Sequence, residues 1–207
     1  ILIVLWITRR EQGLTVPRER IQWQPALILL IPLGMILAAL AVVALISPPN
    51  NFDSMTYHMA RVAHWAYNHD VRHYPSHNLR QLHMNPGAEF ILLHLQILNG
   101  GDRFANLVQW FALVGSLVGV SLIAARLGAS VRGQVFSAVF CGTIPMAVLQ
   151  ACTTQNDLVA GFWYVALACF VLLAADEQDS ARRRVWIAAV GGALGVAILT
   201  KGTMYCF

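Results

Sequence analysis

Residues 25–47, PALILLIPLGMILAALAVVALIS, form a run of 23 residues without a single charge, and this run decides the fold. A helix needs roughly 20 mainly apolar residues to cross the hydrocarbon core of a bilayer. The run therefore predicts a membrane-spanning helix, in which Pro32 is tolerated. Hydropathy and length predict four further spans, at about residues 105–125, 134–152, 158–175 and 186–207. The sequence predicts an all-α, polytopic membrane helix bundle that forms a single transmembrane domain.

The composition of the whole chain supports this class. Of its 207 residues, 57% are hydrophobic and 12% are charged, whereas about 25% of the residues of a typical soluble domain are charged. A soluble globular enzyme, a nucleic-acid-binding module and a disulfide scaffold are therefore excluded. The chain begins with Ile1 rather than Met and stops at Phe207 inside an apolar run, so we expect it to be the N-terminal fragment of a longer protein.

The net charge of +4 comes from arginines gathered in short segments between the apolar runs. There are three such clusters: Arg9, Arg10, Arg18 and Arg20; Arg126 and Arg132; and Arg182, Arg183 and Arg184. Basic loops of membrane proteins lie on the cytoplasmic side. We therefore expect residues 48–104, the hinge 153–157 and the end of the last span to lie on the outer side.

The predicted outer loop, residues 48–104, holds most of the polar chemistry, including all seven histidines. Its first part predicts a helix that lies along the membrane, with an apolar and a polar face. The apolar face would consist of Met55, Met59, Val62 and Ala66, and the polar face of Tyr57, Arg61, His64 and Asn68. Pro75 and the turn at residues 85–87 break the segment, and a second membrane-parallel helix is predicted from about Ala88 to Leu98.

Three charged residues near the predicted span ends each allow a structural and a functional interpretation. Asp53 could cap the helix that follows it or serve as a catalytic or ligand-binding carboxylate. Asp157 closes the polar hinge Thr153–Asp157 and could cap the next span or line a site, because polar groups at membrane depth usually face a cavity or a partner. Lys201 could anchor its helix at the interface or bind the phosphate of a lipid head group.

The histidines raise the question of a metal site. His69, Asp70, His73 and His77 form an eligible group, but Pro75 interrupts the helix that would bring them together. No HExxH or equivalent motif is present, so we expect no metal at these histidines and favour polar packing or hydrogen bonding to a substrate. Nucleophilic catalysis has no support, because the sequence holds no GxSxG motif.

Five short motifs resemble those of a known family. They are FDSMTYHMARV at 52–62, LRQL at 79–82, NPGAEF at 85–90, GDR at 101–103 and TQND at 154–157. Together with the order of spans, they resemble membrane glycosyltransferases of the GT-C fold. The likeness is to a bacterial subgroup akin to the protein mannosyltransferases and the aminoarabinose transferase, and it covers about residues 25–207.

The resemblance implies a multi-pass enzyme of the bacterial inner membrane, with its active site on the extracytoplasmic side. It would move a sugar, with inversion, from a polyprenyl-phosphate-linked donor to a lipid, glycan or protein acceptor. Asp53 matches the general base of the family. The other matched positions are substrate-binding candidates: Asn156 and Asp157 at the second hinge, Lys201, Arg61 and Arg80 as cations for the donor phosphate, and His58 and Tyr57 within the first motif. The resemblance leaves a divalent cation open as a cofactor and implies no nucleic-acid partner.

Two other classes remain open. A transporter or flippase could use Asp53, Asp157 and Lys201 to line its path, and a structural subunit could carry the same fold without activity. Transporters usually place polar groups near the bilayer midplane on broken helices, often in inverted repeats. Here the polar groups gather at one predicted surface and no repeat is visible, so the sequence favours the enzyme.

Overall fold

The computed structural model describes residues 23–206, and this part of the chain contains helices and no strands. The arginine cluster at residues 9–20 lies outside the described residues. Six helices form the bundle: α2 (Trp23–Ile46), α6 (Leu107–Arg126), α7 (Val131–Gly142), α8 (Pro145–Gln150), α9 (Asp157–Asp176) and α10 (Ser180–Thr200). The remaining elements are a π-helical turn η1 (Ser54–His58), α3 (Met59–Asn68), α4 (Arg80–His83), α5 (Gly87–Asn99) and a 3₁₀ turn η2 (Gly202–Cys206).

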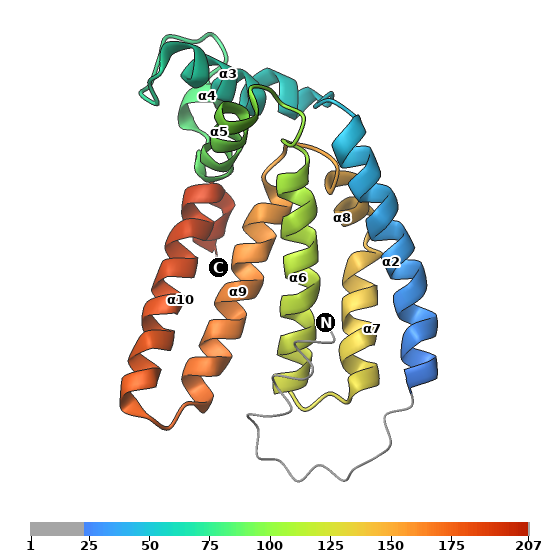
Figure 1. The fold of residues 1–207 in the computed structure, drawn as a ribbon. Coiled ribbons are helices and arrows are strands. Elements are labelled where there is room, and N and C mark those ends of the chain that lie inside the picture. The colour runs from blue at the N-terminus through green and yellow to red at the C-terminus, as the bar shows by residue number, and fades with distance from the viewer. Residues whose placement is uncertain (1–22, 207) are drawn as a thin grey trace.

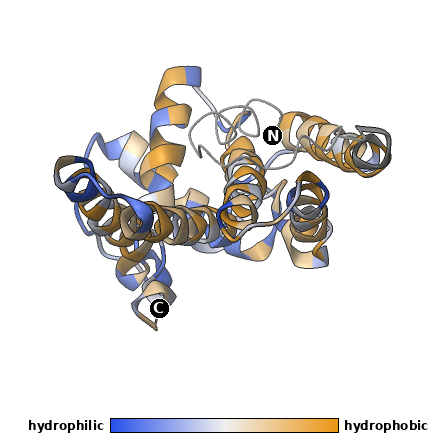
Figure 2. Cartoon of the chain, turned by 90° about the horizontal axis from the view of Figure 1, so that it is seen from below, coloured by the Kyte–Doolittle hydropathy of each residue, from blue (hydrophilic) through white to orange (hydrophobic). Residues whose placement is uncertain are grey.

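The long helices stand side by side in the order α10, α9, α6, α7 and α2, each packed against the next (Figure 1). Seen from below, they form a row, with apolar residues along most of their length (Figure 2). Four of them are long and apolar enough to cross a membrane: Ile28–Ile46, Leu107–Arg126, Asp157–Asp176 and Ser180–Thr200. The predicted all-α helix bundle is confirmed.

Two predicted spans differ from the helices found. Residues 134–152 were expected to form one span, but α7 ends at Gly142 and α8 begins at Pro145. Proline disfavours a helical conformation in the residue before it and cannot donate the backbone hydrogen bond that would continue the helix. Ile144 accordingly has ψ of 121°, and the chain turns there. The last helix begins six residues earlier than predicted, at Ser180, and ends seven residues earlier, at Thr200.

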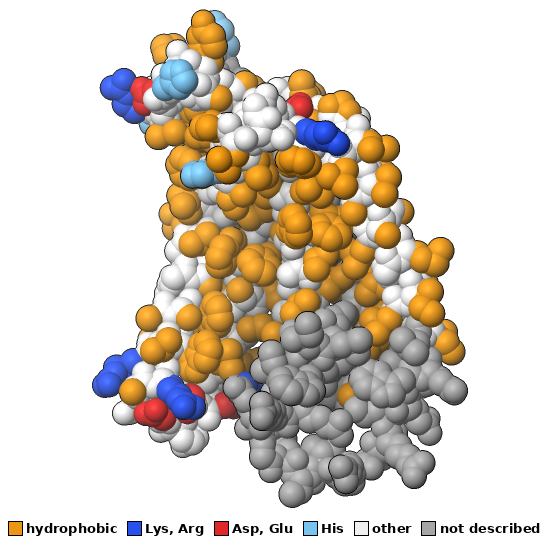
Figure 3. Space-filling view, viewed as in Figure 1, with side chains coloured by type: hydrophobic (Ala, Val, Ile, Leu, Met, Phe, Trp, Pro, Cys, Tyr) orange, Lys and Arg blue, Asp and Glu red, His pale blue; other side chains and the backbone are white. Residues whose placement is uncertain are grey.

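The two ends of the bundle carry different segments. Residues 48–104, the hinge 151–156 and η2 lie at the upper end in Figure 1, whereas the turns 127–130 and 177–179 lie at the lower end. Charged side chains gather at both ends, with an apolar belt between them (Figure 3). Two of the predicted arginine clusters, Arg126 with Arg132 and the run 182–184, lie at or beside the lower turns. Arg126 pairs there with Asp176 at 3.6 Å. The two clusters are thus at the opposite end from residues 48–104, as the predicted topology requires.

The two helices expected within residues 48–104 are present and lie across the upper end (Figure 1). Apolar side chains of α3, α5 and α6 form a shared core beneath them, which includes Val62, Trp65 and Leu92. This core fixes the segment on the bundle.

The predicted division of the first helix into an apolar and a polar face is wrong in part. Met55 is exposed, whereas Tyr57 and Arg61 are buried. The π-helical turn Ser54–His58 explains the first difference, because its i→i+5 hydrogen bonds rotate the following residues relative to an α-helix. Arg61 is buried because it has an acidic partner, described below.

Candidate functional site

Asp53 stands at the start of the π-helical turn and is held from two sides. Its Oδ1 lies 3.4 Å from Nη1 of Arg80, and its Oδ2 accepts a hydrogen bond of 3.2 Å from Nε2 of Gln155. The carboxylate remains 35% exposed. It makes no capping hydrogen bond. The cap is provided by Asn51, whose Oδ1 accepts from the backbone N–H of Ser54 at 2.7 Å. The structure therefore does not use Asp53 as a helix cap.

Two polar hinges of the upper end, the segment 48–54 after α2 and the hinge 153–157 before α9, are in direct contact. Besides the bond between Gln155 and Asp53, the backbone N–H of Thr154 donates to Oγ of Ser54 at 3.3 Å. Ser54 and Thr154 are both fully buried. The hinge before α9 is thus joined to the segment after α2, as expected for two parts of one site.

Asp157 forms an ion pair with Lys201. Asp157 is the first residue of α9, where the helix dipole stabilises a negative charge. Lys201 follows the last residue of α10 in an extended conformation. The two side chains are 38% and 31% exposed, so both can be reached from outside.

Two asparagines fix the end of α10 and therefore the position of Lys201. Nδ2 of Asn156 donates to the carbonyl of Thr200 at 2.9 Å, and Nδ2 of Asn85 donates to the carbonyl of Ile198. The last carbonyls of a helix have no partner within the helix, and these amides provide one. Asn156 is buried, so its amide nitrogen positions Lys201 and does not face an external ligand.

The α5–α10 contact that supports this corner requires a glycine. A Cβ atom on Gly87 would lie 2.8 Å from the Cα of Thr200. Only the absence of a side chain lets the start of α5 approach the end of α10 so closely.

Tyr57 lies beneath the charged groups. It is buried, and the guanidinium of Arg80 lies 5.9 Å from the centre of its ring. The pKa of Tyr57 is raised from 10.0 to about 12, mainly by burial and next by the charge of Asp53, while Arg80 opposes the shift. Asp157 and Glu89 also raise this pKa. Tyr57 is therefore within electrostatic reach of three carboxylates.

A buried charged cluster lies behind this surface. Oε1 of Glu89 is 3.0 Å from Nδ1 of His58 and 3.3 Å from Nη1 of Arg61. Glu89 is completely buried, and the other two side chains are at most 2% exposed. An isolated buried charge is costly, and the pairing reduces that cost. His58 and Arg61, both predicted to bind substrate, are buried in this cluster.

Arg61 connects the buried cluster to the exposed site. Its Nε donates to the carbonyl of Gln81 at 2.8 Å, and its Nη2 donates to the carbonyl of Arg80 at 2.9 Å. The guanidinium also lies 5.7 Å from the centre of the Trp65 ring. Arg61 thereby fixes the backbone of α4, the helix that carries Arg80 to Asp53.

The eight predicted site residues fall into two groups. Asp53, Arg80, Asp157 and Lys201 are partly exposed at the upper end, and Tyr57, His58, Arg61 and Asn156 are buried around them. Sequence reasoning gave Glu89 no role in the site. Its signal was a single carboxylate within the apolar helix GAEFILLHL, which predicts a buried partner. Among the described residues, no three His, Cys, Asp or Glu side chains gather closely enough to hold a metal ion.

Comparisons with protein-family models, with curated proteins and with solved structures found no match.

Proposed function

We propose that the chain is the catalytic part of a membrane glycosyltransferase that uses a polyprenyl-phosphate-linked sugar donor. The observation that carries the proposal is the junction of the two hinges at the upper end. It brings two carboxylate–cation pairs, Asp53 with Arg80 and Asp157 with Lys201, to one surface above four helices suited to a membrane. A lipid-linked donor would present its sugar and phosphate at such a boundary.

Asp53 is the general base of the proposed reaction. It accepts the proton of an acceptor hydroxyl while the hydroxyl oxygen attacks the anomeric carbon of the donor sugar. The bond from that carbon to the phosphate oxygen breaks, and the polyprenyl phosphate leaves with the bonding electrons. A base in this role must reach the acceptor, and Asp53 is partly exposed with only two side-chain contacts to its oxygens.

Arg80 and Lys201 are the candidates for the negative charge that develops on the leaving phosphate. Arg80 uses only Nη1 on Asp53, and Lys201 can use one of the three N–H groups of its Nζ on Asp157, so each keeps donors for a phosphate oxygen. Cations placed where negative charge develops stabilise a transition state. The proposed site lies on the extracytoplasmic face of a bacterial inner membrane, since the two described arginine clusters lie at or beside the opposite end.

One feature favours the transporter as the second candidate. The break between α7 and α8 gives the bundle a discontinuous helix, which is a common device of transporters. The residues at the break are Thr143, Ile144 and Pro145, and none of them carries a charge that could bind an ionic substrate. The charged pairs lie at the upper end instead, which is why the enzyme is the first candidate.

The test uses the full-length protein in bacterial membrane vesicles, supplied with undecaprenyl phosphate linked to radiolabelled mannose, glucose or aminoarabinose. The proposal predicts that one of these labels becomes covalently bound to a new acceptor and that unlabelled undecaprenyl phosphate is released. A label that crosses the membrane without any covalent transfer would overturn the enzyme in favour of the transporter. A protein that neither transfers nor transports any of the three labels would contradict both.

A further inference from the structure

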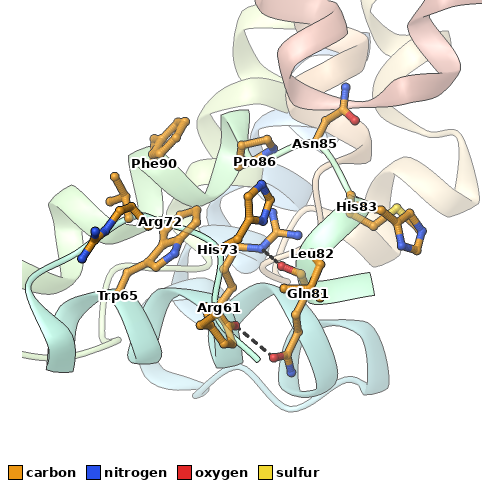
Figure 4. A pocket seen from close by; sticks show the side chains of 13 residues that line it. Arg61, Trp65, Arg72, His73, Gln81, Leu82, His83, Asn85, Pro86 and Phe90 are labelled. Carbon is orange, nitrogen blue, oxygen red and sulfur yellow. Dashed lines mark hydrogen bonds between the residues drawn. The ribbon is translucent and has the colours of Figure 1, made fainter. Parts of the chain in front are cut away.

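A cavity of about 270 Å³ lies beside α4, between α3, α5 and the loop that connects α3 to α4 (Figure 4). This size is close to the lower end of the range of small-ligand pockets, roughly 300–1,000 Å³. The residues that line it are Arg61, Trp65, Val71, Arg72, His73, Tyr74, Gln81, Leu82, His83, Met84, Asn85, Pro86 and Phe90. Asp53, Asp157 and Lys201 are not among them, so the cavity is separate from the two carboxylate–cation pairs.

Four of the lining side chains keep free hydrogen-bonding groups. His73 makes no side-chain hydrogen bond within the described part of the chain, and His83 uses only Nδ1, which lies 2.7 Å from the carbonyl of Leu79. Asn85 uses its amide nitrogen on α10 and keeps its carbonyl oxygen. Arg72 uses only Nε on Asp70. In Figure 4 Arg72 and His83 stand at opposite edges of the group, whereas His73 and Asn85 lie beside Pro86. An imidazole and an amide carbonyl are therefore the groups available to one ligand, and together they can donate and accept.

The rest of the cavity wall is apolar and partly aromatic. Pro86 and Phe90 stand on one side (Figure 4), and the ring of Phe90 stacks on Trp65 with centres 5.4 Å apart. Val71 and Met84 are lining residues that remain exposed. An apolar wall with a few convergent polar groups is the usual lining of a small-molecule site, and it suits a molecule with both C–H faces and hydroxyl groups.

The charges of the cavity are already compensated. Arg61 is paired with Glu89, and Arg72 is paired with Asp70 at 2.5 Å. No carboxylate lines the cavity among the described residues. All three nitrogens of Arg61 are used, on Glu89 and on two backbone carbonyls, and Arg72 points away from the other lining residues in Figure 4. An anionic ligand would therefore find no free cation within the cavity, and a cationic ligand would find no carboxylate. The polar groups that remain favour a neutral ligand.

The surroundings favour a water-soluble ligand over a lipid chain. The loop of residues 69–79 belongs to the part of the upper end that projects at the upper left of Figure 3, where histidine, arginine and acidic side chains gather outside the apolar belt. A hydrocarbon chain would have to leave the membrane to enter the cavity from this side.

We propose that this cavity is a binding site for one neutral saccharide unit. His73 and the carbonyl of Asn85 bond its hydroxyl groups, and its C–H face packs on Pro86 and Phe90. The cavity shares the single-turn helix α4 with the first site: the side chain of Arg80 reaches Asp53, while Gln81, Leu82 and His83 line the cavity. The identification of this saccharide as part of a glycan acceptor rests on the proposed function, whereas the binding itself does not.

The test measures binding directly, by ligand-observed saturation-transfer NMR on the full-length protein in lipid nanodiscs. The probes are the methyl glycosides of mannose, glucose and galactose, with farnesol and inorganic phosphate as the alternatives. Three variants are compared. His73→Ala removes a free donor or acceptor and is expected to weaken binding roughly two- to tenfold. Val71→Trp fills the exposed side of the cavity and is expected to abolish binding. His77→Ala changes an exposed histidine of the same loop that does not line the cavity, and leaves binding unchanged.

The outcomes separate this proposal from the proposed function. Saccharide binding that is lost in Val71→Trp supports the site whether or not transfer is observed, and then a missing transfer counts only against the enzyme. Sugar transfer by a protein that binds none of the three glycosides would overturn the site and leave the enzyme standing. Preferential binding of farnesol or phosphate, or saccharide binding that survives Val71→Trp, would also overturn the proposed saccharide site.

Discussion

The buried contact of Glu89 with Arg61 and His58 makes a sharp prediction about stability. The variant Glu89→Gln keeps the size of the side chain and one carbonyl oxygen, so hydrogen bonds from both partners to Oε1 can persist. The change removes the negative charge, which compensates a guanidinium that is 2% exposed. It also places an amide NH2 at the position of Oε2, which is buried without a hydrogen-bond partner, and both effects destabilise the folded protein.

The expected effect follows from the burial. Removing one member of a buried ion pair typically costs about 3–5 kcal/mol, because the remaining charge is left uncompensated. Arg61 keeps two carbonyl partners, on Arg80 and Gln81, so we expect the lower end, about 3 kcal/mol. For a chain of this size each kcal/mol lowers Tm by about 2–4 °C, which gives a decrease in Tm of about 6–12 °C.

The assay is thermal unfolding in detergent, followed by the reaction of newly exposed thiols with a fluorogenic maleimide. Cys141 and Cys169 are partly buried and report on opening of the bundle. Hydrogen–deuterium exchange over α5 gives a local measurement, because α5 rests on α3 through this cluster. The exchange of the amides at residues 88–93 is expected to accelerate in Glu89→Gln.

The matched control is Glu177→Gln, at the opposite end of the bundle. Glu177 makes no ion pair among the described residues, and its Oε1 accepts from the backbone N–H of Asp179 at 3.1 Å, a bond that glutamine can also accept. Its free energy of unfolding should change by no more than about 0.5 kcal/mol, and its Tm should shift accordingly little. If Glu89→Gln moves Tm as little as the control does, Glu89 carries no charge in the folded protein, and the reasoning about the cluster is wrong.

Three further predictions concern single residues of the upper end. The pKa of Tyr57 rises from 10.0 to about 12 on folding, so the folded state is favoured below pH 10 and loses this contribution as the pH rises toward 12. Burial raises the pKa of Tyr74 as well, so the absorbance of tyrosinate should show fewer phenols titrating near pH 10 than after unfolding, and Tyr57→Phe should reduce that difference by one phenol. Gly87→Ala should lower Tm, since its Cβ would meet the backbone of Thr200 at 2.8 Å, whereas Gly101→Ala, which meets nothing within 4 Å, should not. Asn156→Ala should destabilise the protein by about 1–3 kcal/mol in chemical denaturation, because it leaves the carbonyl of Thr200 without its side-chain partner.

Each of these predictions has a contradicting result. Equal tyrosinate titration in folded and unfolded protein would show that Tyr57 is open to water. Equal Tm values for the two glycine variants would mean that α5 and α10 do not approach as closely as described. An Asn156→Ala variant as stable as the wild type in chemical denaturation would show that the end of α10 needs no amide partner.

The helix bundle could be predicted from the sequence because its signal is strong and local. An apolar run such as residues 25–47 is stable in a bilayer only as a helix, in which the backbone groups bond to one another. The ends of the helices were harder to predict. Hydropathy does not separate α7 from α8, since the residues around Pro145 are apolar, and only the geometry that proline imposes on Ile144 ends the helix there.

The residue types of the candidate site could be read from the sequence, but their exposure and contacts only in part. Asp53 and Asp157 were found because carboxylates next to apolar spans are conspicuous, and both are partly exposed at one end of the bundle. Arg61 was expected on a polar surface because helical periodicity placed it opposite Met59. Its burial depends on Glu89, 28 residues further along the chain, and no local pattern of the sequence encodes that pairing. The π-helical turn was equally invisible, because it changes the periodicity on which the prediction relied.

The most direct test of the central claim is the rate of sugar transfer by Asp53→Asn in the full-length protein, measured with the donor that the wild type uses. A general base typically contributes a factor of roughly 10²–10⁴, so kcat should fall by at least about a hundredfold while the affinity for the donor is retained. Asp70→Asn is the control, because Asp70 pairs with Arg72 on the exposed loop, away from the hinges, and its kcat should equal that of the wild type. If Asp53→Asn transfers sugar as fast as Asp70→Asn does, Asp53 is not the base and the proposed mechanism is wrong.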